Sequence, residues 1–357
     1  MEKNTSNPSS NGPSESKAEG MKLIIQIPCL NEAEQLPETL ADLPRSVPGV
    51  SVVEWLVIDD GSVDETVEVA FAHGVDHVVR LPQNRGLAAA FQSGLDAALK
   101  LGADIVVNTD ADNQYVGADI KKLVAPIVEG RANLVIGDRN TATVEEFSRL
   151  KKRLQAFGSS VVRWVSKTQV TDATSGFRAY SKEAALQLSV VNQYTYTIES
   201  IIQAGRSNAA IESVIIGTNP STRPSRLFGS MWGYIRRNSL TIVRVFAAYK
   251  PMRFFGAISA LFFILSLAAF TPFFIDWVRS DTQGGHLQSL ILGAILAMTG
   301  VQILVLAFVA DLISAHRTIS QRIFERVRRV ELSVGVKPSH HISTQDMQQR
   351  SRMRQSG

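Results

Sequence analysis

Residues 104–115 read DIVVNTDADNQY, a short apolar run that ends in two carboxylates, Asp110 and Asp112. Valine and isoleucine dominate the run and polar residues bound it, a pattern typical of a buried β-strand. Four further segments of the N-terminal half have the same form and are also predicted to be strands: residues 23–27, 54–58, 77–81 and 133–136.

Amphipathic stretches separate these predicted strands. Residues 33–43 and 86–101 carry apolar side chains at helical spacing. Alternation of strands and helices predicts an α/β domain with a mostly parallel sheet and helices on both faces. Ligands of such domains bind beyond the carboxyl ends of the strands, so we expect the functional side chains directly after each strand.

The turns after the strands disfavour two common nucleotide-binding folds. Residues 28–32, after the first strand, lack the Gly-x-Gly-x-x-Gly of a dinucleotide-binding fold, and no Gly-x-x-x-x-Gly-Lys-Ser/Thr occurs. The turn at residues 59–66 begins with Asp59 and Asp60. A carboxylate at this place is able to accept a hydrogen bond from a uracil or guanine base, whereas capping of the next helix explains only one acidic residue.

Asp110 and Asp112 supply hard oxygen ligands one residue apart. Such ligands suit Mg²⁺ or Mn²⁺ and leave coordination positions for substrate phosphates. A solvated acidic turn is the alternative explanation. The inferred position beside the turn at residues 59–66, at one edge of one sheet, favours the metal site.

These motifs together resemble family 2 glycosyltransferases of the GT-A fold, and among them the polyprenyl-phosphate glycosyltransferases typified by dolichol-phosphate mannose synthase. The resemblance covers about residues 23–250. It rests on six segments in order: residues 28–32, 59–66, 84–86, 110–114, 137–139 and 172–178. The sequence departs from the usual family pattern at residues 29–30, 85–87 and 115–116, which surround the donor and leave the nucleotide and the sugar open.

The resemblance implies an inverting hexosyltransferase that uses a nucleotide diphosphate sugar and a Mg²⁺ or Mn²⁺ ion. Asp110 and Asp112, with Gln114 nearby, would hold the ion, and Arg139 would face the phosphates. The predicted catalytic residues are Asp112, Arg139 and Asp172. The predicted donor site consists of Pro28, Asn31, Glu32, Asp59, Asp60, Asn84, Asp110, Ala111 and Asp112.

The charge distribution predicts an anionic acceptor at a membrane surface. Residues 213–275 contain seven basic residues and no acidic one. A hydroxyl acceptor benefits from a carboxylate base, whereas a lipid phosphate is already anionic and needs cations. We therefore expect a polyprenyl phosphate, dolichyl or undecaprenyl, bound through Arg178, Arg223 and Arg226.

Asp172 is predicted to position the acceptor, and a role for Asp172 or Glu199 as catalytic base stays open. Two other functions also stay open. One is a glycosyltransferase whose acceptor is a hydroxyl of a lipid or glycan. The other is a catalytically silent, membrane-tethered protein that binds nucleotide sugars.

Two uncharged runs in the C-terminal third, residues 254–275 and 287–310, predict a transmembrane hairpin. Basic residues flank both outer ends, so the positive-inside rule predicts that the N-terminal domain and the C-terminus are cytoplasmic. Nucleic acid is an unsuitable partner because the basic residues adjoin this hairpin, and homo-oligomerisation through it stays open. The predicted division of the chain is a disordered tail at residues 1–20, the catalytic domain at 21–222, a basic amphipathic interfacial segment at 223–252, the two transmembrane helices within 253–311, a basic cytoplasmic helix at 312–337 and a disordered tail at 338–357.

Composition supports this two-part organisation. The first 240 residues carry 24 basic and 27 acidic side chains, whereas the remaining residues carry 13 and 6. The chain therefore combines an acidic domain suited to a metal with a basic, apolar anchor suited to a bilayer. The single cysteine, Cys29, excludes a scaffold built on intrachain disulfides.

Overall fold

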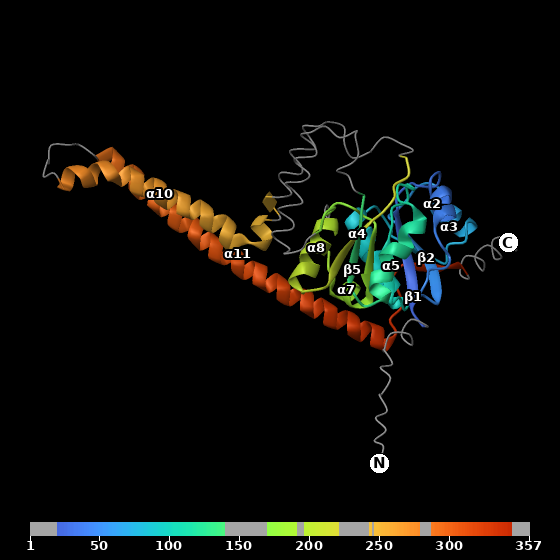
Figure 1. Ribbon diagram of the computed structural model, residues 1–357. Coiled ribbons are helices and arrows are strands. Elements are labelled where there is room, and N and C mark those ends of the chain that lie inside the picture. Colours follow the sequence, from blue (N-terminus) through green and yellow to red (C-terminus); the bar gives the residue numbers. More distant parts are fainter. Residues whose placement is uncertain are drawn as a thin grey trace, which may run out of the picture. The chain divides into compact units, whose positions relative to one another are not determined.

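The computed structural model describes residues 20–139, 170–190, 196–220, 243–244, 246–278 and 287–344. Two compact units make up the chain (Figure 1). The first unit consists of Met1–Ser225 together with Phe324–Gly357, and the second is Arg226–Ile323. Each unit is described by itself below.

An eight-stranded sheet, in the order β7-β5-β6-β4-β1-β2-β3-β8, forms the centre of the first unit. Its strands are β1 (Lys22–Cys29), β2 (Val52–Asp59), β3 (His77–Arg80), β4 (Ile105–Asn108), β5 (Leu134–Asp138), β6 (Arg178–Ser181), β7 (Ile211–Ile215) and β8 (His341–Ser343). Strands β1 to β4 pair in parallel, as do β5 and β7. Strand β6 runs antiparallel to β4 and β5, and β8 runs antiparallel to β3.

Helices cover both faces of the sheet, as the sequence predicted (Figure 1). Alternate side chains of β1 enter different cores: Leu23 and Ile25 pack on one face and Ile24 on the other. The first face is covered by α2 (Leu36–Asp42), α3 (Thr66–Ala72) and α5 (Ile120–Val128), which follows the short helix η1 (Gly117–Asp119). The second face is covered by α4 (Leu87–Lys100), α7 (Lys182–Gln187) and α8 (Tyr196–Arg206).

The five predicted strands are confirmed as β1 to β5, whereas β8 corrects a prediction. Residues 338–357 were expected to be a disordered tail, but His341–Ser343 form the edge strand β8. The polar composition of this segment gives no sign of a strand, because few of its side chains are apolar. Strand β8 is instead held by backbone pairing with β3, where Val78 lies opposite Ile342.

A charged cluster joins β1, β2 and β3 at the amino-terminal ends of these strands. Glu54 Oε2 accepts hydrogen bonds from Lys22 Nζ at 2.7 Å and from His77 Nε2 at 2.8 Å. The other ring nitrogen of His77 lies 3.1 Å from Nε2 of His341 in β8. Burial opposes ionisation of Glu54, but the hydrogen bonds from His77 and Lys22 outweigh it and lower the pKa to about 2.

This cluster predicts a loss of stability in acid. A carboxyl whose pKa is lower in the folded than in the unfolded state stabilises the fold above its unfolded pKa, and that contribution disappears as the pH falls through the folded pKa. We expect Glu54→Gln to lower the melting temperature at pH 7, with the difference from wild type shrinking as the pH falls from about 4.5 toward 2. Thermal unfolding of both proteins across this range is the measurement. A difference independent of pH would contradict the assigned role.

The second unit contains α10 (Pro251–Val278) and the apolar part of α11 (Leu287–Val334). Both helices are long and apolar enough to cross a membrane. They pack through small residues, because Ser259 Oγ donates to the carbonyl of Gly300 and Ser266 Oγ to that of Gly293, each at 2.8 Å. The helices therefore form a paired hairpin that suggests membrane association.

The helix α11 joins two predicted segments. Residues 287–310 and 312–337 were expected as a span and a separate basic helix, but α11 is continuous to Val334. It ends where Gly335 adopts a φ of +73° and the N–H of Val336 donates to the carbonyl of Glu331. This is the hydrogen-bond pattern of a glycine C-cap.

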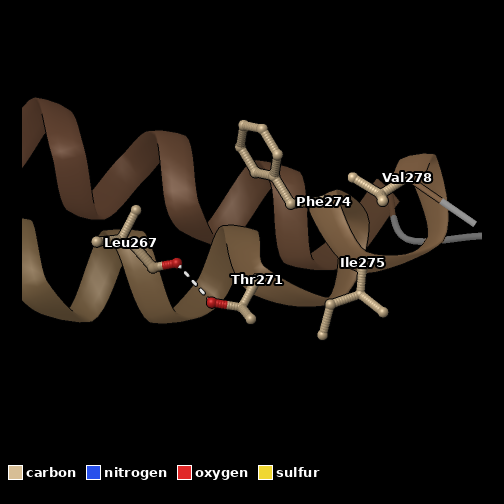
Figure 2. Close-up of a pocket in the computed structure, with 5 residues that line it drawn as sticks. All are labelled: Leu267, Thr271, Phe274, Ile275 and Val278. Atoms are coloured by element: carbon tan, nitrogen blue, oxygen red, sulfur yellow. Dashed lines mark hydrogen bonds between the residues drawn. The ribbon is translucent and has the colours of Figure 1, made fainter.

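A shallow apolar groove lies on α10 and is shown in Figure 2. Its lining residues are Leu267, Thr271, Phe274, Ile275 and Val278. The hydroxyl of Thr271 donates to the carbonyl of Leu267 at 3.0 Å, so the polar group of the groove is already satisfied within the helix (Figure 2). The groove lacks the polar groups that a nucleotide sugar requires, and the site is found elsewhere.

Candidate active site

The loops after β1 and β2 are joined by hydrogen bonds. Asn31 has a φ of +53°, and its side-chain oxygen accepts from the N–H of Val63 at 2.9 Å. In return, the Ser62 hydroxyl accepts from the N–H of Asn31, and the Thr66 hydroxyl accepts from the N–H of Glu32. Two segments predicted to border the donor thus form one surface at the strand ends.

The two acidic residues after β2 organise the adjoining backbone. Asp59 accepts from the N–H of Ser62 at 2.8 Å. Asp60, which is 3% exposed, accepts from the N–H groups of Arg85 and Gly86, each at 2.8 Å. Asp60 therefore fixes the start of α4, and its predicted contact with a base stays a prediction.

Two further residues predicted to border the donor lie in β1 and in the loop after β3. Pro28 is buried in β1, opposite Ile58 of β2. The side-chain oxygen of Asn84 accepts from the N–H of Gly86 at 2.9 Å. Gly61 lies so close to this loop that a β-carbon would approach the carbonyl carbon of Gln83 to 2.6 Å, which explains the glycine.

The carboxylate pair lies in the turn after β4. Ala111 is buried between the two acids, and its carbonyl accepts from the hydroxyl of Thr39 at 2.8 Å. Asp112 accepts from the N–H of Gln114 at 3.1 Å, across Asn113 with a φ of +52°. The turn therefore ties the backbone of Gln114 to Asp112, and the predicted metal site of Asp110, Asp112 and Gln114 stays a prediction.

Asp110 lies in an environment that disfavours its charge. Burial and the neighbouring carboxylate of Asp112 raise the pKa of Asp110 to about 7, although the positive charge of Arg139 opposes this shift. Within the described part of the chain, no hydrogen bond to the Asp110 carboxylate is observed. A cation would favour its charged form.

Arg139 is held in place by Asp172. Its Nε lies 2.8 Å from one carboxylate oxygen of Asp172, and its Nη2 lies 3.1 Å from the other. Burial disfavours the charge of both groups, but their mutual hydrogen bonds outweigh it, so the pKa of Asp172 is lowered and that of Arg139 is raised. Such a carboxylate is a poor base, and its observed action is to orient Arg139.

The segment that carries Asp172 packs against Asp110. A β-carbon on Gly176 would lie 3.1 and 3.2 Å from the two carboxylate oxygens of Asp110. The N–H of Gly176 donates to the hydroxyl of Tyr115, whose ring stacks on Phe177 with centroids 4.9 Å apart. These contacts bring residues 110–115 and 172–177 into one site.

A buried polar network under the site was not predicted. The Gln26 amide donates to the side chain of Asn108 at 2.9 Å, and Asn108 donates to the carbonyl of Gly176 at 2.9 Å. Gln26 and Asn108 are fully buried and lie opposite each other in β1 and β4. The available sequence signal was one polar residue in each of two otherwise apolar strands. Sequence alone does not show that these two residues lie opposite each other, because that depends on the register of β1 and β4.

We expect Asn108→Ala to destabilise the protein by about 2–4 kcal/mol, because each buried polar group left without a partner costs roughly 1–3 kcal/mol. The substitution removes the partner of the Gln26 amide and of the Gly176 carbonyl. The measurement is the melting temperature, with Asn133→Ala, at a partly exposed position, as a comparison. Equal melting temperatures for the two variants would contradict the proposed importance of the network.

The profile of the family described as glycosyl transferase family 2 matches residues 24–188. The chain is also 30% identical to a UDP-N-acetylglucosamine–dolichyl-phosphate N-acetylglucosaminyltransferase of Methanococcus voltae, over 55% of this chain and 86% of that protein. The chain belongs to glycosyl transferase family 2. An undecaprenyl-phosphate mannosyltransferase of Micrococcus luteus is 29% identical to this glycosyltransferase, over 55% of this chain and 83% of the relative.

Solved structures confirm the GT-A fold of this family 2 glycosyltransferase. Glucosyl-3-phosphoglycerate synthase from Mycobacterium tuberculosis, in complex with UDP, matches with a TM-score of 0.51 at 24% identity, over 67% of this chain and 86% of that one. The same enzyme with Mn²⁺ and UDP-glucose matches with a TM-score of 0.50 at 22% identity, over 67% and 84%.

The carboxylates of the glycosyltransferase fit a divalent ion by their chemistry. Among the described residues, no group of three or more His, Cys, Asp or Glu side chains is placed to bind a metal. Mg²⁺ is nevertheless often held by one or two carboxylates together with substrate phosphates. Asp110 and Asp112 are two such carboxylates, one residue apart at the end of β4.

The predicted role of Arg178 in acceptor binding is wrong. Arg178 is fully buried, and its guanidinium donates to the carbonyls of Ser175, Thr197 and Ala173 at 2.5–2.9 Å and to the hydroxyl of Ser200 at 2.6 Å. These bonds hold the segment before β6 on α8, and no lipid phosphate reaches the guanidinium. An arginine beside a Ser-Gly turn looks the same in sequence whether it faces solvent or the core.

The other predicted acceptor residues, Arg223 and Arg226, lie outside the described residues, as does most of the predicted interfacial segment 223–252. Glu199, one of the two candidate bases, is 3% exposed and accepts from the Gln203 amide at 3.3 Å. Its burial in α8 favours a structural role.

Proposed function

We propose that this glycosyltransferase moves a sugar from a nucleotide diphosphate sugar to a polyprenyl phosphate at the cytoplasmic face of a membrane, with inversion at the anomeric carbon. The observation that carries the proposal is an arginine, Arg139, that Asp172 holds in a fixed orientation and whose positive charge acts on the carboxylate of Asp110, next to that of Asp112. A fixed cation beside an acidic ion site suits a diphosphate leaving group.

The donor side of the proposal assigns separate tasks to these residues. Asp110 and Asp112, with Gln114, would hold Mg²⁺ or Mn²⁺, which when bound would stabilise negative charge on the diphosphate. Arg139 stays protonated and oriented by Asp172, so it provides a second, permanent positive charge without reorganisation. The fold relative bound to Mn²⁺ and UDP-glucose suggests UDP-sugars and Mn²⁺ as the first probes.

The acceptor side requires no general base. An oxygen of the acceptor phosphate forms the new bond to the anomeric carbon while the bond from that carbon to the diphosphate breaks, and the nucleoside diphosphate leaves. The phosphate is already anionic at pH 7, so no proton has to be removed. The occupied oxygens and lowered pKa of Asp172 agree with this scheme, and the names of the two relatives support the lipid phosphate.

The membrane arrangement rests on α10 and α11. Both are proposed to cross the bilayer, and the basic residues outside the hairpin support, by the positive-inside rule, a cytoplasmic location of the catalytic domain and the C-terminus. Arg223 and Arg226 are proposed to bind the acceptor phosphate near the membrane surface.

The test is sugar transfer in vesicles that contain the full-length protein and either polyprenyl phosphate or free polyprenol. A panel of labelled UDP-, GDP- and dTDP-sugars is supplied with Mn²⁺. Labelling of the lipid that requires its phosphate is expected. Labelling of free polyprenol would favour the hydroxyl-acceptor enzyme, and neither transfer nor donor hydrolysis with any donor would favour a silent binding protein.

A further inference from the structure

The last turns of α11 pack on the catalytic domain through a buried arginine. Arg328 is 9% exposed, and its Nη1 lies 2.6 Å from the carbonyl oxygen of Leu188, 3.2 Å from that of Leu186 and 3.5 Å from that of Ala185. These are carbonyls at the end of α7, where a helix leaves backbone acceptors without partners inside the helix. A side chain of α11 therefore caps a helix of the catalytic domain.

Ion pairs extend this contact to α4. Asp96 Oδ1 lies 3.7 Å from Nε of Arg328, and its Oδ2 lies 3.0 Å from Nζ of Lys100. The same ammonium, whose side chain is 7% exposed, lies 3.0 Å from Glu331 of α11. We call Asp96, Lys100, Arg328 and Glu331 the helix clamp.

Both helices held by the clamp lead back to the candidate active site. Helix α4 begins next to Gly86, whose N–H is bound by Asp60. Helix α7 follows β6 directly, and β6 follows the segment with Asp172 and Gly176. The end of α11 is thus connected through α4 to the predicted donor loop, and through α7 and β6 to the segment that orients Arg139.

Burial of Arg328 is costly, because its nearest described carboxylate is 3.7 Å away and its other partners are neutral carbonyls. An apolar side chain would satisfy simple packing between two helices at lower cost. Burial of an arginine is expected where one defined arrangement of α11 on the catalytic domain is needed. An enzyme that takes its acceptor from a bilayer has this need, whereas chemistry on a freely diffusing acceptor does not.

We infer that Arg328 is a positioning residue, which fixes the catalytic domain on the membrane helix α11 so that a bilayer-embedded acceptor reaches the site. This inference rests on the proposed function for its benefit to catalysis, but the coupling of helix and domain is measurable by itself. Arg328 has no contact with the candidate donor site among the described residues, so the variant should keep its chemistry.

The first experiment compares two acceptors in vesicles that contain the full-length protein: a long-chain polyprenyl phosphate in the bilayer and a short-chain, water-soluble prenyl phosphate. For Arg328→Met we expect kcat/KM with the long-chain acceptor to fall by about ten- to a hundredfold, the range that misplacement by a remote mutation produces. The KM for the donor and the activity with the short-chain acceptor should stay unchanged. Arg328→Lys should restore part of the loss.

Arg329→Met is the matched control. Arg329 is the next residue, but its side chain is 51% exposed and pairs with Glu325 of the same helix. Its loss removes one positive charge without touching the clamp, so both acceptor activities should stay as in the wild type. An equal fall of Arg328→Met with both acceptors, or no fall with either, would overturn the positioning role.

The second experiment measures the coupling without any acceptor. Spin labels on Lys121→Cys in α5 and Ile319→Cys in α11, both exposed positions, report the distance between domain and helix. Cys29 is buried and is left in place. We expect a narrow distance distribution that Arg328→Met broadens and Arg329→Met does not. If Arg328→Met leaves the distance distribution unchanged, the positioning role of Arg328 is contradicted, even if the proposed sugar transfer is confirmed. If Arg328→Met broadens the distribution, that role is supported, even if neither prenyl phosphate is glycosylated.

Discussion

Asp110→Asn and Asp112→Asn are each expected to lower kcat/KM for sugar transfer by roughly a hundred- to a thousandfold, the effect of removing one group that stabilises transition-state charge. Both substitutions keep the size of the side chain and an oxygen, so the hydrogen bond from Gln114 to residue 112 can persist. The loss should therefore be in the charge available to a divalent ion and not in folding.

The measurement is initial transfer rate against Mn²⁺ concentration, together with the melting temperature. The wild type should lose activity in EDTA and recover it with Mn²⁺ or Mg²⁺, while the variants should need more metal or fail to respond. Glu129→Gln, an exposed acid paired with Arg131, is the control and should behave as the wild type. Full activity of both aspartate variants, with no effect of EDTA, would contradict the metal site.

Arg139→Met is expected to lower kcat/KM by roughly a hundredfold or more, because it removes a partly buried cation that we propose stabilises charge on the leaving diphosphate. Arg139→Lys should recover little, since an ammonium cannot reproduce the two parallel bonds to Asp172. Asp172→Asn should also lower kcat/KM, because it weakens the hydrogen bonds that orient the guanidinium of Arg139.

The double variant separates the two roles considered for Asp172. If Asp172 acts only through Arg139, adding Asp172→Asn to Arg139→Met should reduce the rate little further, because residues that act as a unit are not additive. If Asp172 is instead a base, the losses of the two single variants should multiply in the double variant. Asp172→Asn alone should then also change the acidic limb of the pH–rate profile. Multiplicative losses would thus contradict the orienting role.

The predicted and unpredicted parts of the fold differ in where their stability comes from. Strands β1 to β5 are buried and apolar, so their sequences show them directly. Strand β6 has the sequence RAYS, and β7, with the sequence IESVI, has no fully buried residue. These two strands and β8 depend on pairing with distant partners, which local composition does not reveal.

The same distinction applies to the site. Asp110 and Asp112 were predicted as metal ligands because carboxylates at a strand end have few structural explanations, and the metal site stays a prediction. Arg178 was misassigned because its partners are backbone carbonyls, which any sequence offers. The orienting bond from Asp172 to Arg139 joins residues 33 positions apart, so only the folded chain shows that the base candidate is engaged by an arginine.

The chemical structure of the product tests the central claim most directly. Full-length protein in vesicles is incubated with polyprenyl phosphate and the donor identified by the panel, and the lipid and the released nucleotide are analysed by mass spectrometry and phosphorus NMR. We predict a lipid with one sugar and one phosphorus, joined as a phosphodiester with inverted anomeric configuration, and release of the nucleoside diphosphate. A lipid diphosphate with release of the nucleoside monophosphate, or a sugar on a lipid hydroxyl, would contradict the account.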